Sequence, residues 1–528
     1  MVVQVIMLVL FFAVMIGIGV YCRRHSTDVN GFVLGGRSVG PWLTAFAYGT
    51  SYFSAVIFIG YAGQFGWNFG LASTWIGLGN AFIGSLLAWR ILGRRTRIMT
   101  QHLDSKTMPD FFGKRFDSEA LKVAASLIVF VFLIPYTASL YNGLSSLFNM
   151  AFSVPYWAVI LVMAALTAVY VIFGGYMATA LNDFVQGIIM LVGICVVIGA
   201  VLASNGGLTE AVRQLSLLPS EYPETAGTQG SFISFFGTQP LYLFFVVMLT
   251  SLGTWGLPQM VGKFYAIRSE DAIRKGTVIS TAFAVVIAGG SYFLGGFGRL
   301  YADKITYTAS GAVSFDSIVP TMLSTLPEIV IGIVIVLVLS ASMSTLSSLV
   351  LTSSSTLVLD VVAPLRKKQM DEKKKVLAMR VFIVFFIVVS AVIAILKDTY
   401  NFSMIAQMMG VSWGALAGSF LAPFLYGLYW KRTSKASVWA CFAFGSVLMI
   451  LQMLKSMGVL SLSGGFLGFV FRNSLYSGVF AMVGGLILVP IVSLLTPGPD
   501  KAAADAMFAC YDRTVTVQTT TALGEDKQ

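Results

Sequence analysis

Long apolar runs alternate with short polar segments along almost the whole chain. A run of about 20 apolar residues is long enough for a helix to cross the hydrocarbon core of a bilayer. Hydropathy predicts about thirteen such spans, at residues 3–22, 40–62, 70–92, 120–150, 156–174, 180–203, 236–257, 277–299, 328–362, 376–397, 403–429, 436–455 and 475–496. The pattern therefore predicts an all-α polytopic membrane protein.

The composition agrees with this fold class. Hydrophobic residues make up 57% of the 528 residues and charged residues 11%, with a mean hydropathy of +0.84. A soluble domain carries about a quarter charged residues, so a soluble protein is excluded. The net charge of +11 is attributed to basic loops on one side of a membrane rather than to nucleic-acid binding.

Basic residues concentrate in alternate loops, at residues 23–37, 94–115, 263–275, 366–375 and 431–435. The third of these groups begins with Lys263. Because cytoplasmic loops carry an excess of Lys and Arg, we expect the N-terminus outside, the C-terminus in the cytoplasm, and a multi-pass protein of the bacterial inner (plasma) membrane. Residues 1–496 are expected to form one transmembrane domain, and residues 497–528 a cytoplasmic tail.

A stripe of small hydroxyl residues lies within the run at residues 328–362. Ala341, Ser344, Thr345 and Ser348 are spaced i, i+3, i+4 and i+7, so they share one helix face, and Ser347 borders that face. Oxygen ligands suit hard cations such as Na⁺. Alternatively, the hydroxyls bond their own helix or allow close helix packing.

Two predicted spans carry small and polar interruptions near their middle, around Gly49 in the second and between Leu249 and Gly256 in the seventh. Paired interruptions at corresponding positions are typical of transporters built from inverted repeats, with the binding site at the breaks. The repeats would cover residues 40–203 and 236–429, with an extra helix at 3–22 and flanking helices at 436–496. Close packing of Gly and Ser is the alternative explanation.

Among the acidic residues, Asp183 is the one expected inside the membrane, at the start of the sixth span. An ionisable side chain in that environment is costly and indicates a functional role. The alternative is an acid at the membrane boundary, stabilised by a helix N-terminus.

The chain resembles the sodium:solute symporter family, and most closely its bacterial sodium/proline branch, over about residues 5–495. The resemblance rests on residues 32–41 (FVLGGRSVGP), 108–116 (MPDFFGKRF), 174–186 (GGYMATALNDFVQ) and 340–348 (SASMSTLSS). It implies a LeuT-type core of two inverted five-helix repeats.

The resemblance also implies sites for the coupling ion, Na⁺, of which one or two would bind. The main site would use the carbonyls of Thr50, Phe53 and Ala341 with the hydroxyls of Ser344 and Thr345. A second site, present in some members, would use Asp183, Ser344, Ser347 and Ser348.

The expected substrate pocket departs from the proline carriers. Tyr52 stands where those carriers have Asp, and Val56 and Thr250 stand where they have Trp, whereas Tyr136 matches. Residues 134–137 lack the Arg of the sialic acid carriers. The resemblance implies a pocket lined by Tyr52, Ser54, Val56, Tyr136, Thr250, Thr254 and Trp255, although aromatic side chains there can also serve as gates or core packing.

Together these features predict sodium-coupled secondary active uptake of a small organic solute, an amino acid such as proline or a small carboxylate, by alternating access. A proton-coupled carrier of the same fold, with Asp183 as the proton site, is one alternative, and a membrane sensor is another. An enzyme is not expected, because His25 and His102 are the only histidines and the sequence contains no nucleophile constellation. The expected partners are the solute and the lipid bilayer, with neither nucleic acid nor an obligatory protein partner.

Overall fold

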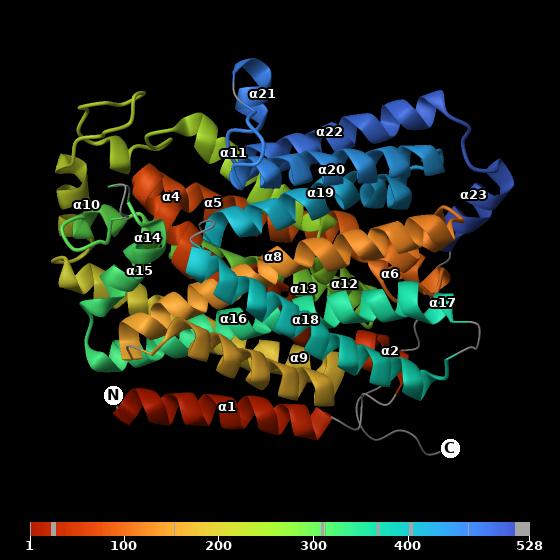
Figure 1. The fold of residues 1–528 in the computed structure, drawn as a ribbon, viewed down its shortest axis with the longest axis horizontal. Helices are drawn as coiled ribbons and strands as arrows, with labels where there is room; N and C mark the ends of the chain where they lie inside the picture. The colour runs from red at the N-terminus through yellow and green to blue at the C-terminus, as the bar shows by residue number, and fades with distance from the viewer. Residues whose placement is uncertain are drawn as a thin grey trace.

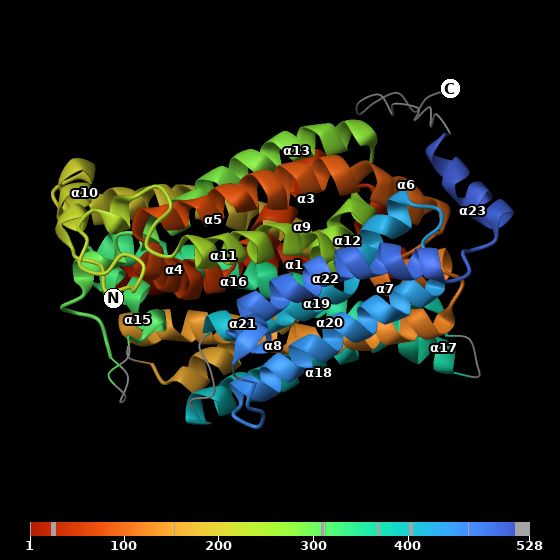
Figure 2. The same cartoon turned by 90° about the horizontal axis from the view of Figure 1, so that it is seen from above.

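The computed structural model describes residues 2–22, 28–152, 154–307, 311, 313–366, 370–400, 405–462 and 464–512. Helices run side by side along the long axis of the molecule and form one bundle (Figures 1 and 2). The basic residues Arg23 and Arg24 and the last part of the predicted tail, residues 513–528, lie outside the described residues.

Among the described residues, ten helices are long and apolar enough to cross a membrane, and a bent pair makes an eleventh. Eight of the ten lie on α1 (Val2–Cys22), α8 (Glu119–Phe152), α9 (Tyr156–Ser204), α16 (Glu328–Leu357), α18 (Glu372–Tyr400), α19 (Ile405–Tyr429), α20 (Lys435–Ser456) and α22 (Ser474–Leu495). The other two join several segments, at Val56–His102 and at Glu270–Gly295, where α13 (Glu270–Ala284) continues through η9 (Val285–Gly289) into α14 (Gly290–Gly295). The predicted all-α membrane fold is therefore confirmed, whereas the count of thirteen spans stays a prediction.

The first predicted interruption is present as a break after α3 (Pro41–Tyr52). Phe53 has an extended backbone, and the chain resumes as η3 (Val56–Tyr61) and α4 (Ala62–Phe69). After Gly70, whose φ is +60°, come α5 (Thr74–Gly79), η5 (Asn80–Leu87), η6 (Trp89–Gly93) and α6 (Arg94–His102). The short helix α7 (Met108–Arg115) then precedes α8.

The second predicted interruption lies between α11 (Pro240–Leu252) and α12 (Pro258–Ala266). The two helices meet at 47°, with the short helix η8 (Gly253–Gly256) and an extended Leu257 between them. Pro258 can open α12 because the first residues of a helix need no N–H donor. Both sequence-predicted breaks are thus features of the fold.

The segment α9 covers two of the predicted spans and consists of two helices that meet at a kink at Gly175. The φ and ψ of Gly175 are +54° and −148°, a conformation that residues with a side chain rarely adopt. This break lies between the predicted spans at 156–174 and 180–203.

The middle of the bundle is formed by α16 and α19, whose apolar segments are mostly buried. α16 packs against α8, α9, α18, α1 and α3. By contrast, α1 lies at the edge of the bundle (Figure 1) and exposes most of its apolar side chains, as a lipid-facing helix does. The smaller helices α10 (Leu208–Leu217), α15 (Phe315–Ser324), α2 (Val29–Leu34), α14 (Gly290–Gly295), α17 (Ala363–Leu365), α21 (Gly465–Val470) and α23 (Lys501–Phe508) complete the described chain.

Candidate functional site

The C-terminal end of α3 meets the hydroxyl stripe of α16. The Ser344 hydroxyl donates to the Thr50 carbonyl at 2.9 Å, and the Thr345 hydroxyl donates to the same oxygen at 3.1 Å. Both hydroxyls also lie close to the Ala341 carbonyl, at 3.2 and 3.1 Å. The structure therefore brings together four of the five residues predicted for the main Na⁺ site, and all four are buried.

The break in α3 explains why the Thr50 carbonyl is available. The N–H of Phe53 donates to Gly49 at 3.1 Å, and the backbone then becomes extended. The Thr50 carbonyl therefore lies among the last of the helix, which have no intrahelical partner. Phe53, the fifth predicted residue, is located at the break itself, and its ring stacks on Tyr52 with centroids 4.3 Å apart.

This cluster offers only carbonyl and hydroxyl oxygens, which are the ligands that hard cations prefer. None of the five residues is a carboxylate, so the cluster has no negative charge to balance a divalent ion. The donor set therefore fits a monovalent hard cation such as Na⁺.

A second polar cluster surrounds Asp183, which is fully buried in α9. The Lys263 ammonium lies 3.6 Å from the Asp183 carboxylate and 3.0 Å from the Ser348 hydroxyl. Ser348 also shares a hydrogen bond of 2.7 Å with Ser51. The Ser347 hydroxyl donates within its own helix, to the Ser344 carbonyl at 2.9 Å.

Lys263 was missed by the sequence reasoning, which placed it in a basic loop. It lies instead inside α12 and is 3% exposed, with its ammonium 5.4 Å from the centre of the Tyr176 ring. The loop assignment is wrong because the helix resumes at Pro258, directly after the break. The available signal was that Lys263 is the one charged residue between Pro258 and Ala266.

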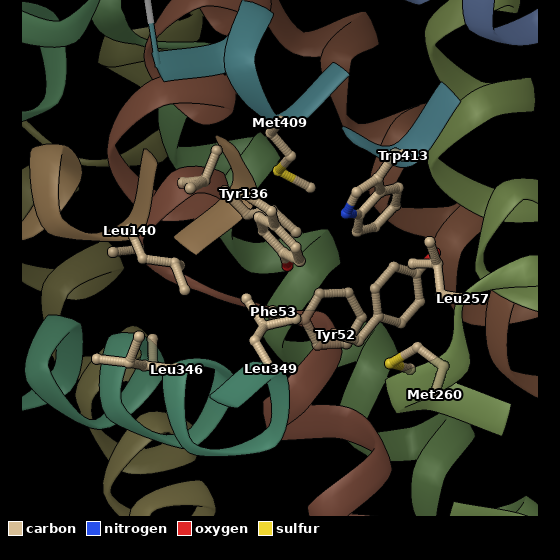
Figure 3. Close-up of a cluster of buried hydrophobic side chains, with 14 of the residues drawn as sticks. Tyr52, Phe53, Tyr136, Leu140, Leu257, Met260, Leu346, Leu349, Met409 and Trp413 are labelled. Atoms are coloured by element: carbon tan, nitrogen blue, oxygen red, sulfur yellow. The ribbon is translucent and has the colours of Figure 1, made fainter. Parts of the chain in front are cut away.

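Two of the residues predicted for the substrate pocket belong to a buried aromatic cluster beside the break in α3 (Figure 3). The Tyr52 hydroxyl donates to the Thr250 carbonyl at 2.5 Å and so connects the two broken helices. Trp413 of α19 lies between Tyr52 and Tyr136, with ring centroids 5.9 and 6.0 Å away. Trp413 was not predicted, because the sequence has no interruption that marks its place in α19.

The remaining predicted pocket residues are also buried and lie around the two breaks. Ser54 and Val56 lie at the break in α3, where Ser54 is near the Tyr136 hydroxyl. Thr254 and Trp255 are turned toward η5, and they donate to the carbonyls of Gly84 at 3.4 Å and of Ile83 at 3.0 Å. The Thr250 hydroxyl is bonded within its own helix, to Val246 at 2.8 Å.

A small cavity of about 50 Å³ lies between α2, α12 and α16. Lys263 and Ser348 line it, and so do Lys106 and Thr107 from the loop between α6 and α7. The cavity therefore extends from a basic loop to the cluster around Asp183.

These features point to a class of protein: a multi-pass membrane carrier in which oxygens of a broken helix and of a hydroxyl-bearing helix converge. The sequence model of the Sodium:solute symporter family matches residues 32–445. The chain belongs to this family, as the resemblance predicted. It is therefore a sodium-coupled solute transporter and not an enzyme.

Characterised relatives match nearly the whole chain. The osmoregulated proline transporter OpuE of Bacillus subtilis is 27% identical over 506 residues, which cover 94% of this chain and 96% of OpuE. The sodium/pantothenate symporter of Escherichia coli is 28% identical over 445 residues, or 84% of this chain and 88% of that protein.

Solved structures share the fold. A Na⁺-coupled sialic acid symporter, in a substrate-bound outward-open state, superposes with a TM-score of 0.74 at 17% identity, covering 94% of this chain and 98% of that one. Mhp1, a nucleobase-cation-symport-1 family transporter, superposes with a TM-score of 0.51 at 13% identity. The superposition covers 91% of this chain and 98% of Mhp1. Neighbours of this kind have the LeuT fold, as the resemblance predicted.

Proposed function

We propose that the protein takes up a small amino acid such as proline, or a small carboxylate, together with Na⁺ bound by Thr50, Phe53, Ala341, Ser344 and Thr345. The observation that carries this proposal is the convergence of the Ser344 and Thr345 hydroxyls on the Thr50 carbonyl. A cation held by these oxygens bridges the broken helix and α16, so its binding favours one arrangement of the two elements over another.

The solute class is supported by the relatives, among which are proline and pantothenate carriers. The pocket is proposed to lie at the two breaks, lined by Tyr52, Ser54, Val56, Tyr136, Thr250, Thr254, Trp255 and the unpredicted Trp413. Because these side chains include no charged group, a solute carboxylate would be held by hydroxyls, by freed backbone groups or by Na⁺ itself. Because its hydroxyl donates to the Thr250 carbonyl, Tyr52 would respond to a movement of either broken helix.

Alternating access is proposed to involve residues 40–203 and 236–429 as two inverted repeats, because each begins with a broken helix. The cavity that reaches Lys106 is proposed as the cytoplasmic exit, with the N-terminus outside and residues 497–528 inside, since the basic loops indicate that side. Both broken helices and α16 belong to one chain, which supports a carrier without an obligatory protein partner.

Thermal unfolding of the purified protein in Na⁺ or in K⁺ tests this proposal. A ligand that binds only the folded protein stabilises it by RT ln(1 + [L]/Kd), or about 2.7 kcal/mol at a hundred times Kd. We expect Na⁺ to raise the Tm and one solute among amino acids, monocarboxylates, sugars and vitamins to raise it further. Equal Tm values in Na⁺ and K⁺ under every solute would contradict the proposed site.

A further inference from the structure

The buried ammonium of Lys263 lies among the residues expected to bind a second Na⁺. It is 3.0 Å from the Ser348 hydroxyl and 3.6 Å from the Asp183 carboxylate, and both of these residues belong to that expected set. We propose that Lys263 occupies the position of the second cation, so that the transporter binds a single Na⁺, at the main site. This inference rests on the proposed function of Thr50, Ser344 and Thr345.

The surroundings of Lys263 are those of a cation site. Its side chain is 4% exposed and that of Asp183 is 0% exposed, so little water screens the pair. The Tyr176 ring lies 5.4 Å from the ammonium, and the face of an aromatic ring attracts a cation. A carboxylate, a hydroxyl and an aromatic face thus surround this ammonium.

The residues around Asp183 do not fit a further Na⁺ beside that ammonium. Asp183 carries one negative charge, and Lys263 already balances it at 3.6 Å. A second cation on Asp183 and Ser348 would meet the ammonium within a few Å, in a buried region where like charges repel strongly.

Lys263 also differs from a free ion because it is covalently part of α12. Its contacts connect three elements: α12 itself, α9 through Asp183, and α16 through Ser348. A bound Na⁺ leaves the site in each cycle, whereas the ammonium remains. Lys263 is therefore a specificity-determining residue that fixes how many ions are coupled to each solute.

Equilibrium binding of ²²Na⁺ to the purified full-length protein tests the proposal, with K⁺ as the control ion. We expect one Na⁺ per wild-type protein and two per Lys263→Gln protein, in which the carboxylate is left without its cation. Adding Asp183→Asn to Lys263→Gln should return the number to one. Lys106→Gln is the matched control, because Lys106 lines the same cavity, and it should still bind one.

Two Na⁺ bound to the wild-type protein, or one bound to a folded Lys263→Gln protein, would overturn the proposal. If Lys263→Gln does not fold, Asp183→Asn alone decides the question. We expect that variant to bind one Na⁺, as the wild type does, and loss of Na⁺ binding would show that the single ion is bound at Asp183 and would contradict us. Absence of Na⁺ binding by the wild-type protein would instead refute the proposed function itself.

Discussion

At the scale of the residue, the proposed Na⁺ site depends on a single backbone oxygen, the Thr50 carbonyl, which the break in α3 leaves without a partner in its own helix. Two hydroxyls of α16 reach it at 2.9 and 3.1 Å. The Ser342 hydroxyl lies on another face of α16. It donates within the helix, to the Val338 carbonyl at 2.7 Å. The helix face on which a hydroxyl lies therefore decides whether it can reach the Thr50 carbonyl.

Replacing both Ser344 and Thr345 by Ala should raise the Na⁺ concentration for half-maximal binding by about tenfold to a hundredfold. Each lost polar contact costs about 0.5–1.5 kcal/mol, and about 1.4 kcal/mol corresponds to a factor of ten. Thermal shifts over a Na⁺ titration measure this change. Ser342→Ala is the matched control and should leave the Na⁺ dependence near that of the wild type; an equal shift in both would exclude a specific role for the stripe.

At the residue scale, the sequence predicted the side-chain positions that follow from the helical period. It did not predict the positions that follow from packing between helices. Ser344 and Thr345 were identified because the spacing of the stripe fixes the face that they share. Lys263 and Trp413 were not, because their burial depends on which way α12 and α19 face after the chain has folded. No local pattern of a single helix contains that information.

Interrupted helices determine the architecture at the scale of elements. Both predicted breaks, after α3 and between α11 and α12, exist because small and polar residues there weaken the continuous helix. The sequence predicted the all-α class and these breaks, whereas it could not fix the exact ends of α9 or α16. Helix ends in an apolar run depend on neighbouring helices more than on local propensity.

Gly175→Ala should lower the free energy of unfolding by about 1–3 kcal/mol, since a side chain there would be held in a disfavoured backbone conformation. The new Cβ would also lie 2.9 Å from the Phe32 backbone oxygen. Gly199→Ala, in the same helix, is the control, because a Cβ there meets nothing within 4 Å. Thermal unfolding should show a lower Tm for the first variant only, and equal Tm values would contradict the strained break.

At the scale of the whole molecule, the end of the described chain folds back on the bundle (Figure 1). The Arg95 guanidinium lies over the rings of Tyr429 and Tyr511, 4.1 and 4.5 Å from their centres. The Tyr511 hydroxyl donates to the Leu428 carbonyl at 3.1 Å. Burial lowers the pKa of Arg115, which stands over Phe508, to about 10, so Arg115 stays charged at neutral pH.

Tyr511→Ala should lower stability by about 1 kcal/mol, the size of a cation–π contact with some burial, without changing Na⁺ affinity. Asp505→Asn removes only the half-exposed ion pair with Lys431 and should have almost no effect, since exposed ion pairs contribute little. Thermal unfolding with and without Na⁺ measures the stability and the Na⁺ affinity of both variants separately. A change in Na⁺ affinity for Tyr511→Ala would show that this end of the chain is coupled to the ion site.

If Lys263 replaces the second Na⁺, as proposed, the charge that the transporter moves in each cycle is reduced. The ammonium is covalently part of the protein, so it is not transferred across the membrane. With one Na⁺ per neutral solute, each cycle moves one net charge inward. At 100 mV and a tenfold Na⁺ gradient this provides about 3.7 kcal/mol, enough for roughly 500-fold accumulation. An anionic carboxylate would instead cross together with Na⁺ without net movement of charge. Its uptake would be driven only by the Na⁺ concentration gradient, which supports roughly tenfold accumulation. Whether uptake generates a current would therefore reveal the charge of the solute before its chemical identity is known.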